Sequence, residues 1–375
     1  MLNRRTLRIK IMQSLFAFEQ CKEANHLLAH DLIDERFQPD LNSMEPQDKE
    51  LLRKQKKAAM QLFERKFRGK EVEENSDSKI SSAVDEAFEL FNKQVKKDQS
   101  FLSKNIIIEI EKLTGIYHDV LSLLIEFASL AAAEKKVNHS HYANHPLVTA
   151  LANHTELTAS LLKSGSMWLK HKDSVRSWFK EVVKEDDAYQ EFIASKKPSE
   201  EDQRSIIKHL VRKRILGAGP INDFFEAEDI RWAEDREIIK SLVDKTIKSF
   251  EGTAIVLQKL SLDWEDDKLF VNKLFTNTIE LDEKHKQLIA QNTRNWEVDR
   301  LPLTDRVILE MALAEMVTFP NIPVKVTINE YIELTKEYST PKSRQFINGI
   351  LDVMSKAMKD SGAIKKSGRG LIDNK

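Results

Sequence analysis

Apolar residues recur at spacings of three and four along most of this chain, which is the pattern of amphipathic helices. Glycine and proline, the residues that most often interrupt a helix, occur only 10 and 9 times in 375 residues. No long stretch alternates apolar and polar residues as a half-buried strand would. We therefore expect an all-α protein.

The clearest helices lie near the C-terminus and carry their own start signals. Pro323 suits a first helical position, and the helix it starts should end near Tyr338. Thr340 is a good N-cap for the next helix, with Pro341 in its first turn. The apolar stripes expected to face the core are Val324, Ile328, Tyr331, Ile332 and Thr335 in the first, and Ile347, Ile350, Leu351, Met354 and Met358 in the second.

One flank of the second helix is unusual for a plain core helix. Phe346 lies at the edge of the stripe, and Lys342 and Gly349 lie on the same flank. A helical glycine costs about 1 kcal/mol relative to alanine, so something is expected to approach it closely. Either another helix packs over Gly349 and Phe346 is ordinary core, or Phe346 is an aromatic platform beside a cation, an arrangement that suits single-stranded RNA.

The first helix, about residues 4–20, places three arginines beside its apolar face. Leu7, Ile11, Leu15 and Phe18 form that face, and Arg4, Arg5 and Arg8 cluster next to it, with Lys10 on a different side. Cations at a helix N-terminus oppose the helix dipole, so local stability does not explain the arginines. They indicate either an anionic partner or salt bridges to acids elsewhere in the fold.

Several of these segments resemble one family. IPVKVTINEYIELTKEY and KSRQFINGILD are similar to the two halves of the C-terminal signature of NusB, the transcription antitermination factor, at matching separation. RLPLTDRVILEMALAEM (300–316) resembles the preceding helix of that family, and RRTLRIKIMQSLFAFEQ (4–20) its arginine-bearing first helix. The resemblance covers residues 1–20 and about 232–358. It implies a NusB-like helical core interrupted by a large helical insertion.

The resemblance also implies partners and binding residues. A NusB-like protein would bind boxA RNA of ribosomal RNA leader transcripts together with the ribosomal protein NusE, and help RNA polymerase read through terminators. Asp305 would face NusE, although an acid in a first helical turn also suits the dipole without a partner. The candidate RNA-binding residues are Arg4, Arg5, Arg8, Lys10, Phe16, Lys342, Ser343, Arg344 and Phe346.

The chain is expected to divide into four parts. Residues 1–68 would be NusB-like helices, 69–220 an inserted helical bundle that starts with a polar linker, 221–358 the C-terminal NusB-like domain, and 359–375 a flexible basic tail. The basic run HLVRKRI (209–215) resembles a nucleic-acid patch. It ends a helix that acids open after Ser199, so capping matched to the helix dipole is the favoured interpretation.

Other classes of function find little support in the sequence. No phosphate-cradling glycine motif, H-E-x-x-H or G-x-S-x-G is present, so we expect neither an enzyme nor a cofactor. His139, His141, His145 and His154 crowd one region without a nearby cysteine, which favours a histidine-rich surface turn over a zinc site. The single cysteine, Cys21, excludes an internal disulfide and suggests the cytoplasm. Polar residues interrupt the longest apolar run, at 120–133, so no membrane span is expected.

The sequence therefore supports two functions. The first is an RNA-binding transcription antitermination factor, in which any affinity for RNA comes from local patches because the formal net charge is only −1. The alternative is a helical protein-interaction scaffold without specific RNA binding, in which the inserted bundle is the working surface.

Overall fold

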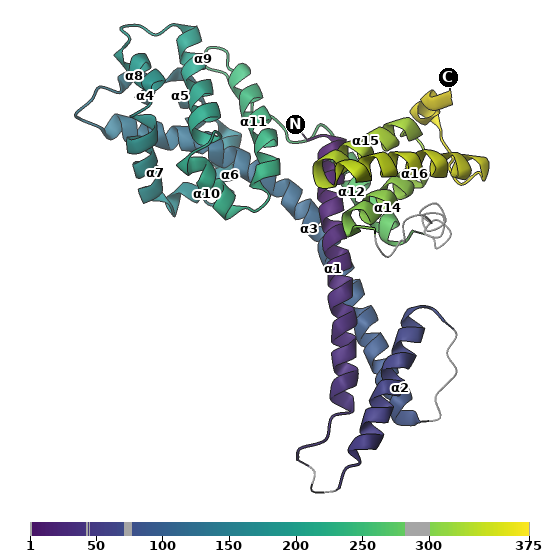
Figure 1. Cartoon of the computed structure of the whole chain (residues 1–375). Helices are drawn as coiled ribbons and strands as arrows, with labels where there is room; N and C mark the ends of the chain where they lie inside the picture. The colour runs from purple at the N-terminus through teal and green to yellow at the C-terminus, as the bar shows by residue number, and fades with distance from the viewer. Residues whose placement is uncertain (1, 43, 45, 71–76, 282–300, 375) are drawn as a thin grey trace. The chain divides into compact units, whose positions relative to one another are not determined.

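The computed structural model describes residues 2–42, 44, 46–70, 77–281 and 301–374, and the regular elements in these ranges are helices (Figure 1). The all-α prediction is therefore confirmed. The only extended pairing in the described residues is an isolated bridge between Glu251 and Ala254. Contacts divide the chain into two units. Unit 1 comprises Met1–Arg4 and Ile108–Asp267, and unit 2 comprises Arg5–Ile107 and Lys268–Lys375.

These units do not share the boundaries expected from the sequence. The chain passes between them at 4/5, 107/108 and 267/268, whereas the insertion was expected to span 69–220. The crossing at 107/108 lies inside helix α3 (Ser78–Ala133), which contributes residues to both units. The predicted fourfold division thus remains a hypothesis about folding units.

Helices α1 (Arg4–Arg36), α2 (Lys49–Phe67) and the first part of α3 pack together in unit 2. Their shared core consists of Ala29, Ile33, Phe37, Ala59, Phe63, Ile80, Ala83, Val84, Ala87 and Phe91. Polar contacts on its surface include Asn25 Nδ2 to Asp98 Oδ2 at 2.7 Å. The apolar spacing predicts separate helices at about 4–20 and 24–37, and at about 84–95 and 106–133. In the structure each pair is one continuous helix, α1 and α3, because no proline interrupts them and the only glycine is Gly115.

The second part of unit 2 contains α14 (Leu303–Thr318), α15 (Val324–Tyr338), α16 (Pro341–Asp360) and most of α12 (Trp264–Ile279). The stripe predicted for α16 is buried throughout, and in α15 only Ile332 is partly exposed. Thr340 caps α16 by accepting a hydrogen bond from the Ser343 amide. The sequence predicts a helix over about 265–291 from its apolar spacing. In the described residues α12 ends at Ile279, and the part of the prediction that falls on 282–291 lies outside them.

The C-terminal segment, expected to be disordered, contacts the loop before α15. Lys366 Nζ donates to the Phe319 carbonyl at 2.9 Å, and the Ser367 amide donates to the Pro320 carbonyl at 3.1 Å. Gly370 lies so close to Pro320 that an added Cβ would overlap its carbonyl oxygen. A short 3-10 helix covers Gly368–Asn374.

Unit 1 surrounds the second part of α3 with short helices. They are α4 (Ser140–Ala143), α5 (Pro146–Ala152), α6 (Thr155–Ser164), α7 (Lys172–Trp178), α8 (Asp187–Ala194), α9 (Glu200–His209), α10 (Pro220–Glu228) and α11 (Trp232–Lys248). Large buried side chains, among them Tyr117, Phe127, Trp168, Tyr189 and Trp232, fill its core. Their burial is the main favourable term for this unit.

The basic run and the histidines of unit 1 have structural partners. Ser199 is the N-cap of α9 and forms a capping box with Asp202, while Arg212 pairs with Asp244 and Arg214 with Asp186. His139 and His145 are buried, which corrects the expected surface turn. The His139 ring forms a hydrogen bond with the Tyr189 hydroxyl, and the His145 ring forms one with the Gln203 carbonyl. Neighbouring aromatic side chains help to bury both rings.

Helix α3 is long and apolar enough to cross a membrane by length and composition alone. Within its most apolar window, however, 61% of the residues are buried inside the structure. The core helix of a globular protein passes the same test, so α3 is weak evidence for a membrane span.

Candidate nucleic-acid interface

Arg8 lies at the centre of a buried polar cluster in unit 2. Its Nε and Nη2 donate to the two carboxylate oxygens of Glu315 at 2.7 and 2.8 Å, and the two side chains are only 3% and 0% exposed. Thr327 Oγ1 and Tyr331 Oη also donate to Glu315, at 3.0 and 3.1 Å. The guanidinium lies over the Phe270 and Tyr331 rings. Arg8 thus joins α1 to α12, α14 and α15.

Electrostatics hold this cluster in its charged form. Burial alone lowers the pKa of Arg8, but the hydrogen bonds and charge of Glu315 outweigh it and raise that pKa above its ordinary value. Burial also raises the pKa of Tyr331 well above its usual range, so its hydroxyl remains a donor. Of the two interpretations of the arginines, a salt bridge to an acid elsewhere in the fold is therefore the correct one for Arg8. Its side chain is buried and cannot contact an RNA phosphate in this structure.

Arg5 lies nearer the surface but is also paired. Its side chain is 41% exposed, and its Nε and Nη2 donate to the two oxygens of Glu330 on α15 at 3.0 and 2.9 Å. The charges of Glu333 and Glu337 add to Glu330 in raising the pKa of Arg5. A phosphate that binds Arg5 must compete with this acidic flank of α15.

The remaining basic candidates of α1 have different surroundings. Arg4 pairs with Asp266 and with Asp267 within unit 1. Lys10 is buried, with 4% of its surface exposed. Neither residue offers the exposed cation that the sequence suggested, because Arg4 is paired with acids that lie far from it in the sequence and Lys10 is buried.

The start of α16 is the most open basic segment among the candidates. Lys342 and Arg344 are exposed in its first turn, while Ser343 is buried and its hydroxyl lies 2.9 Å from that of Thr340. The hydrogen bond from Lys336 is the main cause that lowers the pKa of Glu333, and the charges of Arg5 and Arg344 add to it, so both arginines act on the same carboxylate. Amide groups at a helix start also favour an anion.

Two further candidates are aromatic residues. Phe346 is half-buried on α16, and Phe16 on α1 is 39% exposed. Phe16 follows Arg5 by eleven residues, about three helical turns, so the two side chains share one side of α1. Gly349 is exposed and a Cβ added there would meet nothing within 4 Å. Among the described residues no helix packs over Gly349, so that one of the two alternatives for this flank is not found in this part of the chain.

Asp305, the candidate for a protein contact, is 1% exposed. Its carboxylate accepts a hydrogen bond from the Ser339 hydroxyl, which ties the start of α14 to the end of α15. In this arrangement Asp305 is a structural acceptor.

Comparison with known proteins matches the part of the chain that carries the candidates of α16. The NusB family model matches residues 251–356, a range that includes α12, α14, α15 and most of α16. Residues 251–356 form a NusB-family domain.

Three curated relatives, each named transcription antitermination protein NusB, are similar to short segments of this chain. The relative from Chloroherpeton thalassium is 47% identical over 73 residues, 20% of this chain and 35% of that protein. The relative from Salinibacter ruber is 46% identical over 68 residues, 18% and 42% of the two chains. That from Dictyoglomus turgidum is 44% identical over 69 residues, 18% and 46%.

The chain thus spans less than half the length of the curated NusB proteins it matches. No solved structure matches it. The NusB domain contains Asp305 and the candidates of α16, whereas Arg4, Arg5, Arg8, Lys10 and Phe16 lie outside the matched range. The Arg8–Glu315 pair nevertheless ties α1 to the NusB domain through buried contacts.

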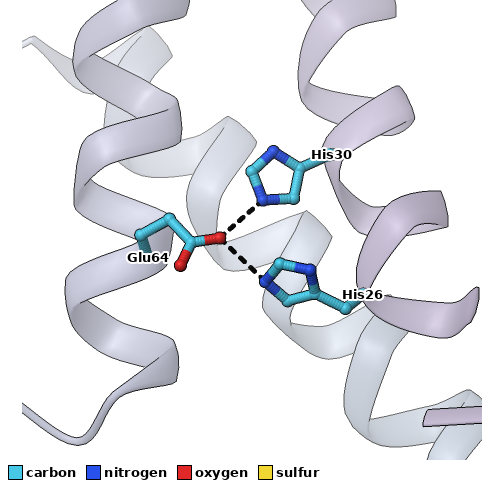
Figure 2. A group of neighbouring side chains, drawn as sticks. All are labelled: His26, His30 and Glu64. Atoms are coloured by element: carbon cyan, nitrogen blue, oxygen red, sulfur yellow. Dashed lines mark hydrogen bonds and ion pairs between the residues drawn. The ribbon is translucent and has the colours of Figure 1, made fainter. Parts of the chain in front are cut away.

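One cluster with metal-ligating side chains was missed by sequence reasoning. His26 and His30 on α1 and Glu64 on α2 are the metal-capable group found among the described residues, with all their ligand atoms within 4.8 Å of one another (Figure 2). The two histidines could have been recognised from the sequence, because residues four positions apart lie on one face of a helix. The third ligand could not be found without the pairing of α1 with α2.

Proposed function

We propose that this protein is an RNA-binding transcription antitermination factor. In this proposal it binds boxA-type RNA of ribosomal RNA leader transcripts together with the ribosomal protein NusE, within the antitermination complex of RNA polymerase. It would act in the cytoplasm and without catalysis. The carrying observation is that exposed Lys342 and Arg344 start α16 beside half-buried Phe346, inside the NusB domain.

The binding surface that we propose is smaller than the sequence suggested. Lys342 and Arg344 would bind phosphates at the start of α16, and Phe346 and Phe16 would stack on unpaired bases. Arg5 would join them once a phosphate displaces Glu330. Arg8 and Lys10 would support the surface from beneath, and Ser343 would help to hold the start of α16 through its hydrogen bonds with the N-cap Thr340.

The test is binding of the full-length protein to a short boxA-like RNA and to a scrambled RNA, with and without NusE. Selective binding that NusE strengthens would support the proposal. The double variant Lys342→Gln/Arg344→Gln should weaken boxA binding by about tenfold or more, as expected from losing two phosphate contacts. The matched control Lys135→Gln/Lys136→Gln removes two exposed lysines of unit 1 and should leave binding unchanged.

Equal, weak binding to both RNAs with no effect of NusE would overturn the proposal. It would favour the second candidate, a protein-interaction scaffold whose working surface is the helical unit 1. The observation that favours this candidate is the internal pairing of Arg8 and Arg5 with Glu315 and Glu330. Two arginines that suggested an anionic ligand are thereby already matched by acids of the same chain.

A further inference from the structure

His26 and His30 direct the same ring atom at one carboxylate oxygen. His30 Nε2 lies 2.7 Å from Glu64 Oε1, and His26 Nε2 lies 2.8 Å from the same oxygen (Figure 2). Only the His30 contact has hydrogen-bond geometry. His26 Nε2 is buried and has no hydrogen-bond partner among the described residues, although it lies within ion-pair distance of Glu64. Buried polar atoms normally have a hydrogen-bond partner. A buried imidazole nitrogen that faces a carboxylate without forming a hydrogen bond therefore suggests that the nitrogen serves to bind a ligand.

The surroundings hold the three side chains in place. The His26 ring lies 4.5 Å from that of Phe67 and 5.6 Å from that of Phe63, and the His30 ring meets Phe63 edge-on at 5.3 Å. Phe63 is fully buried next to Glu64 in the sequence. The three polar side chains are between 22% and 31% exposed, so ions in solution can reach them. Packed walls and partial access are what a preorganised metal site requires.

We propose that His26, His30 and Glu64 form a binding site for a divalent cation of the zinc type. Two imidazole nitrogens and one carboxylate oxygen are a recognised ligand set for Zn²⁺, with a fourth position left for water or an exchangeable ligand. Hard cations such as Mg²⁺ prefer oxygen ligands alone. The site would therefore select Zn²⁺ or a similar first-row ion over Mg²⁺.

The two contacts with Glu64 need only a small adjustment to accept the ion, and all the ligand atoms already lie within 4.8 Å of one another. Tetrahedral Zn²⁺ with ligands at about 2.1 Å separates neighbouring ligand atoms by roughly 3.4 Å. The present separations of 2.7 and 2.8 Å must open by about 0.6 Å, which rotation of the Glu64 side chain supplies. Glu64 Oε2 lies 3.7 Å from Arg68 Nε. The other carboxylate oxygen, Oε1, faces the two histidines and is therefore the one available to bind the metal ion.

Binding would also link two helices. His26 and His30 belong to α1 and Glu64 to α2, and residues 37–48 connect these helices. A bound ion would join them at the end of α2 opposite the connection, and so would stabilise this part of unit 2 by mass action. The proposal is independent of RNA binding, because none of its ligands belongs to the proposed RNA surface.

The test is a calorimetric titration of the chelator-treated full-length protein with Zn²⁺. We expect one tight site per chain, and affinity about tenfold or more weaker in each of His26→Gln, His30→Gln and Glu64→Gln. The matched control His141→Gln removes a half-buried histidine of unit 1 and should keep the tight site. Mg²⁺ should neither bind there nor displace Zn²⁺.

A measurement on the unaltered protein guards against variants that fold poorly. Co²⁺ in place of Zn²⁺ should give the intense visible absorption of a four-coordinate ion. Only the weak spectrum of hydrated Co²⁺, or tight Zn²⁺ binding that persists in all three variants, would overturn the proposal. The cluster would then be an ordinary ion pair between two histidines and a glutamate.

Discussion

Arg5 and Arg8, three residues apart on α1, have very different environments. Arg8 is enclosed with Glu315 by Thr327 and Tyr331, whereas Arg5 meets Glu330 in contact with solvent. A buried charge that loses its partner retains the full cost of its desolvation, while an exposed pair contributes little. The difference between the two arginines is therefore one of burial and not of residue type.

Replacement of these arginines should reveal the difference. Arg8→Ala leaves the Glu315 carboxylate buried and unpaired, so we expect the free energy of unfolding of unit 2 to fall by about 3–5 kcal/mol. Arg5→Ala should cost about 1 kcal/mol or less. Hydrogen exchange of amides in α14 and α15 measures both effects. Similar losses in the two variants would contradict the assignment of Arg8 as a buried structural charge.

Gly349 offers a second test at a single residue. The site is exposed, lies within α16, and has room for a methyl group, so Gly349→Ala should stabilise the helix by about 0.5–1 kcal/mol. If RNA approaches this flank closely, the same methyl group should weaken RNA binding. Thermal unfolding and RNA titration measure the two effects.

The matched control is Gly115→Ala, because that glycine also lies within a helix with nothing within 4 Å of an added Cβ. It should stabilise the protein without changing RNA affinity. Equal RNA affinities for Gly349→Ala and the unaltered protein would show that the glycine is not kept for RNA.

At the scale of single elements, α5 depends on the neutral form of one histidine. His145 Nδ1 accepts a hydrogen bond from the Leu147 amide and caps the helix, while Nε2 lies 3.0 Å from the Gln203 carbonyl. Both bonds are made by the neutral ring with its proton on Nε2. Burial lowers the pKa of His145 to about 4.

This depressed pKa predicts an acid sensitivity of unit 1. Between about pH 6.5 and pH 4 the unfolded chain binds a proton at His145 that the folded chain does not, so stability falls as the pH falls. The loss at this site should reach about 3 kcal/mol. His145→Gln should remove it, which denaturant unfolding at pH 7 and pH 4 can measure by tryptophan fluorescence.

That fluorescence is suitable because Trp168, Trp178, Trp232 and Trp264 belong to unit 1. Asp119 in the same unit has a pKa raised by burial to about 6, which favours the folded state in acid. The comparison must therefore be made between the variant and the unaltered protein. An identical pH dependence in both would contradict the role given to His145.

The sequence predicted elements better than it predicted their partners. The apolar stripes and caps of α15 and α16 follow from local spacing, and they were found as expected. The sequence analysis did not predict that the expected helices join into α1 and α3. The apolar spacing is weak where they join, but no proline stands there to end a helix. Ser199 and its capping box were also predictable, since the bonds lie within four residues.

For the whole molecule, the candidate site could be predicted only where it is local. Lys342, Arg344 and Phe346 lie on one helix, so their spacing was sufficient to propose a shared surface. The pairing of Arg8 with Glu315 joins residues 307 positions apart, and no pattern in the sequence fixes such a contact. Long-range ion pairs therefore account for most of the difference between expected and observed site residues.

The proposed RNA surface predicts a modest dependence on salt. Arg5, Lys342 and Arg344 would neutralise three phosphates, which gives a slope of log affinity against log salt of about −2 for single-stranded RNA. Lys342→Gln/Arg344→Gln should reduce the slope to about −0.7, while Lys135→Gln/Lys136→Gln should leave it at about −2. Equal slopes in both double variants would place the RNA contacts elsewhere on the molecule.

Helix α3 has a consequence for how the chain can be cut. Proteases cleave most readily at exposed irregular segments, and the crossing between the units at 107/108 lies within continuous helix. The crossing at 267/268 lies in α12, shortly after an irregular segment, residues 249–263, that separates α11 from α12. A single nick in that segment would cut the backbone, yet most of unit 1 would stay covalently joined to the first part of unit 2 through α3. Gene fragments meant to release unit 1 must therefore supply a new helix start near residue 108, because four amides would lose their carbonyl partners.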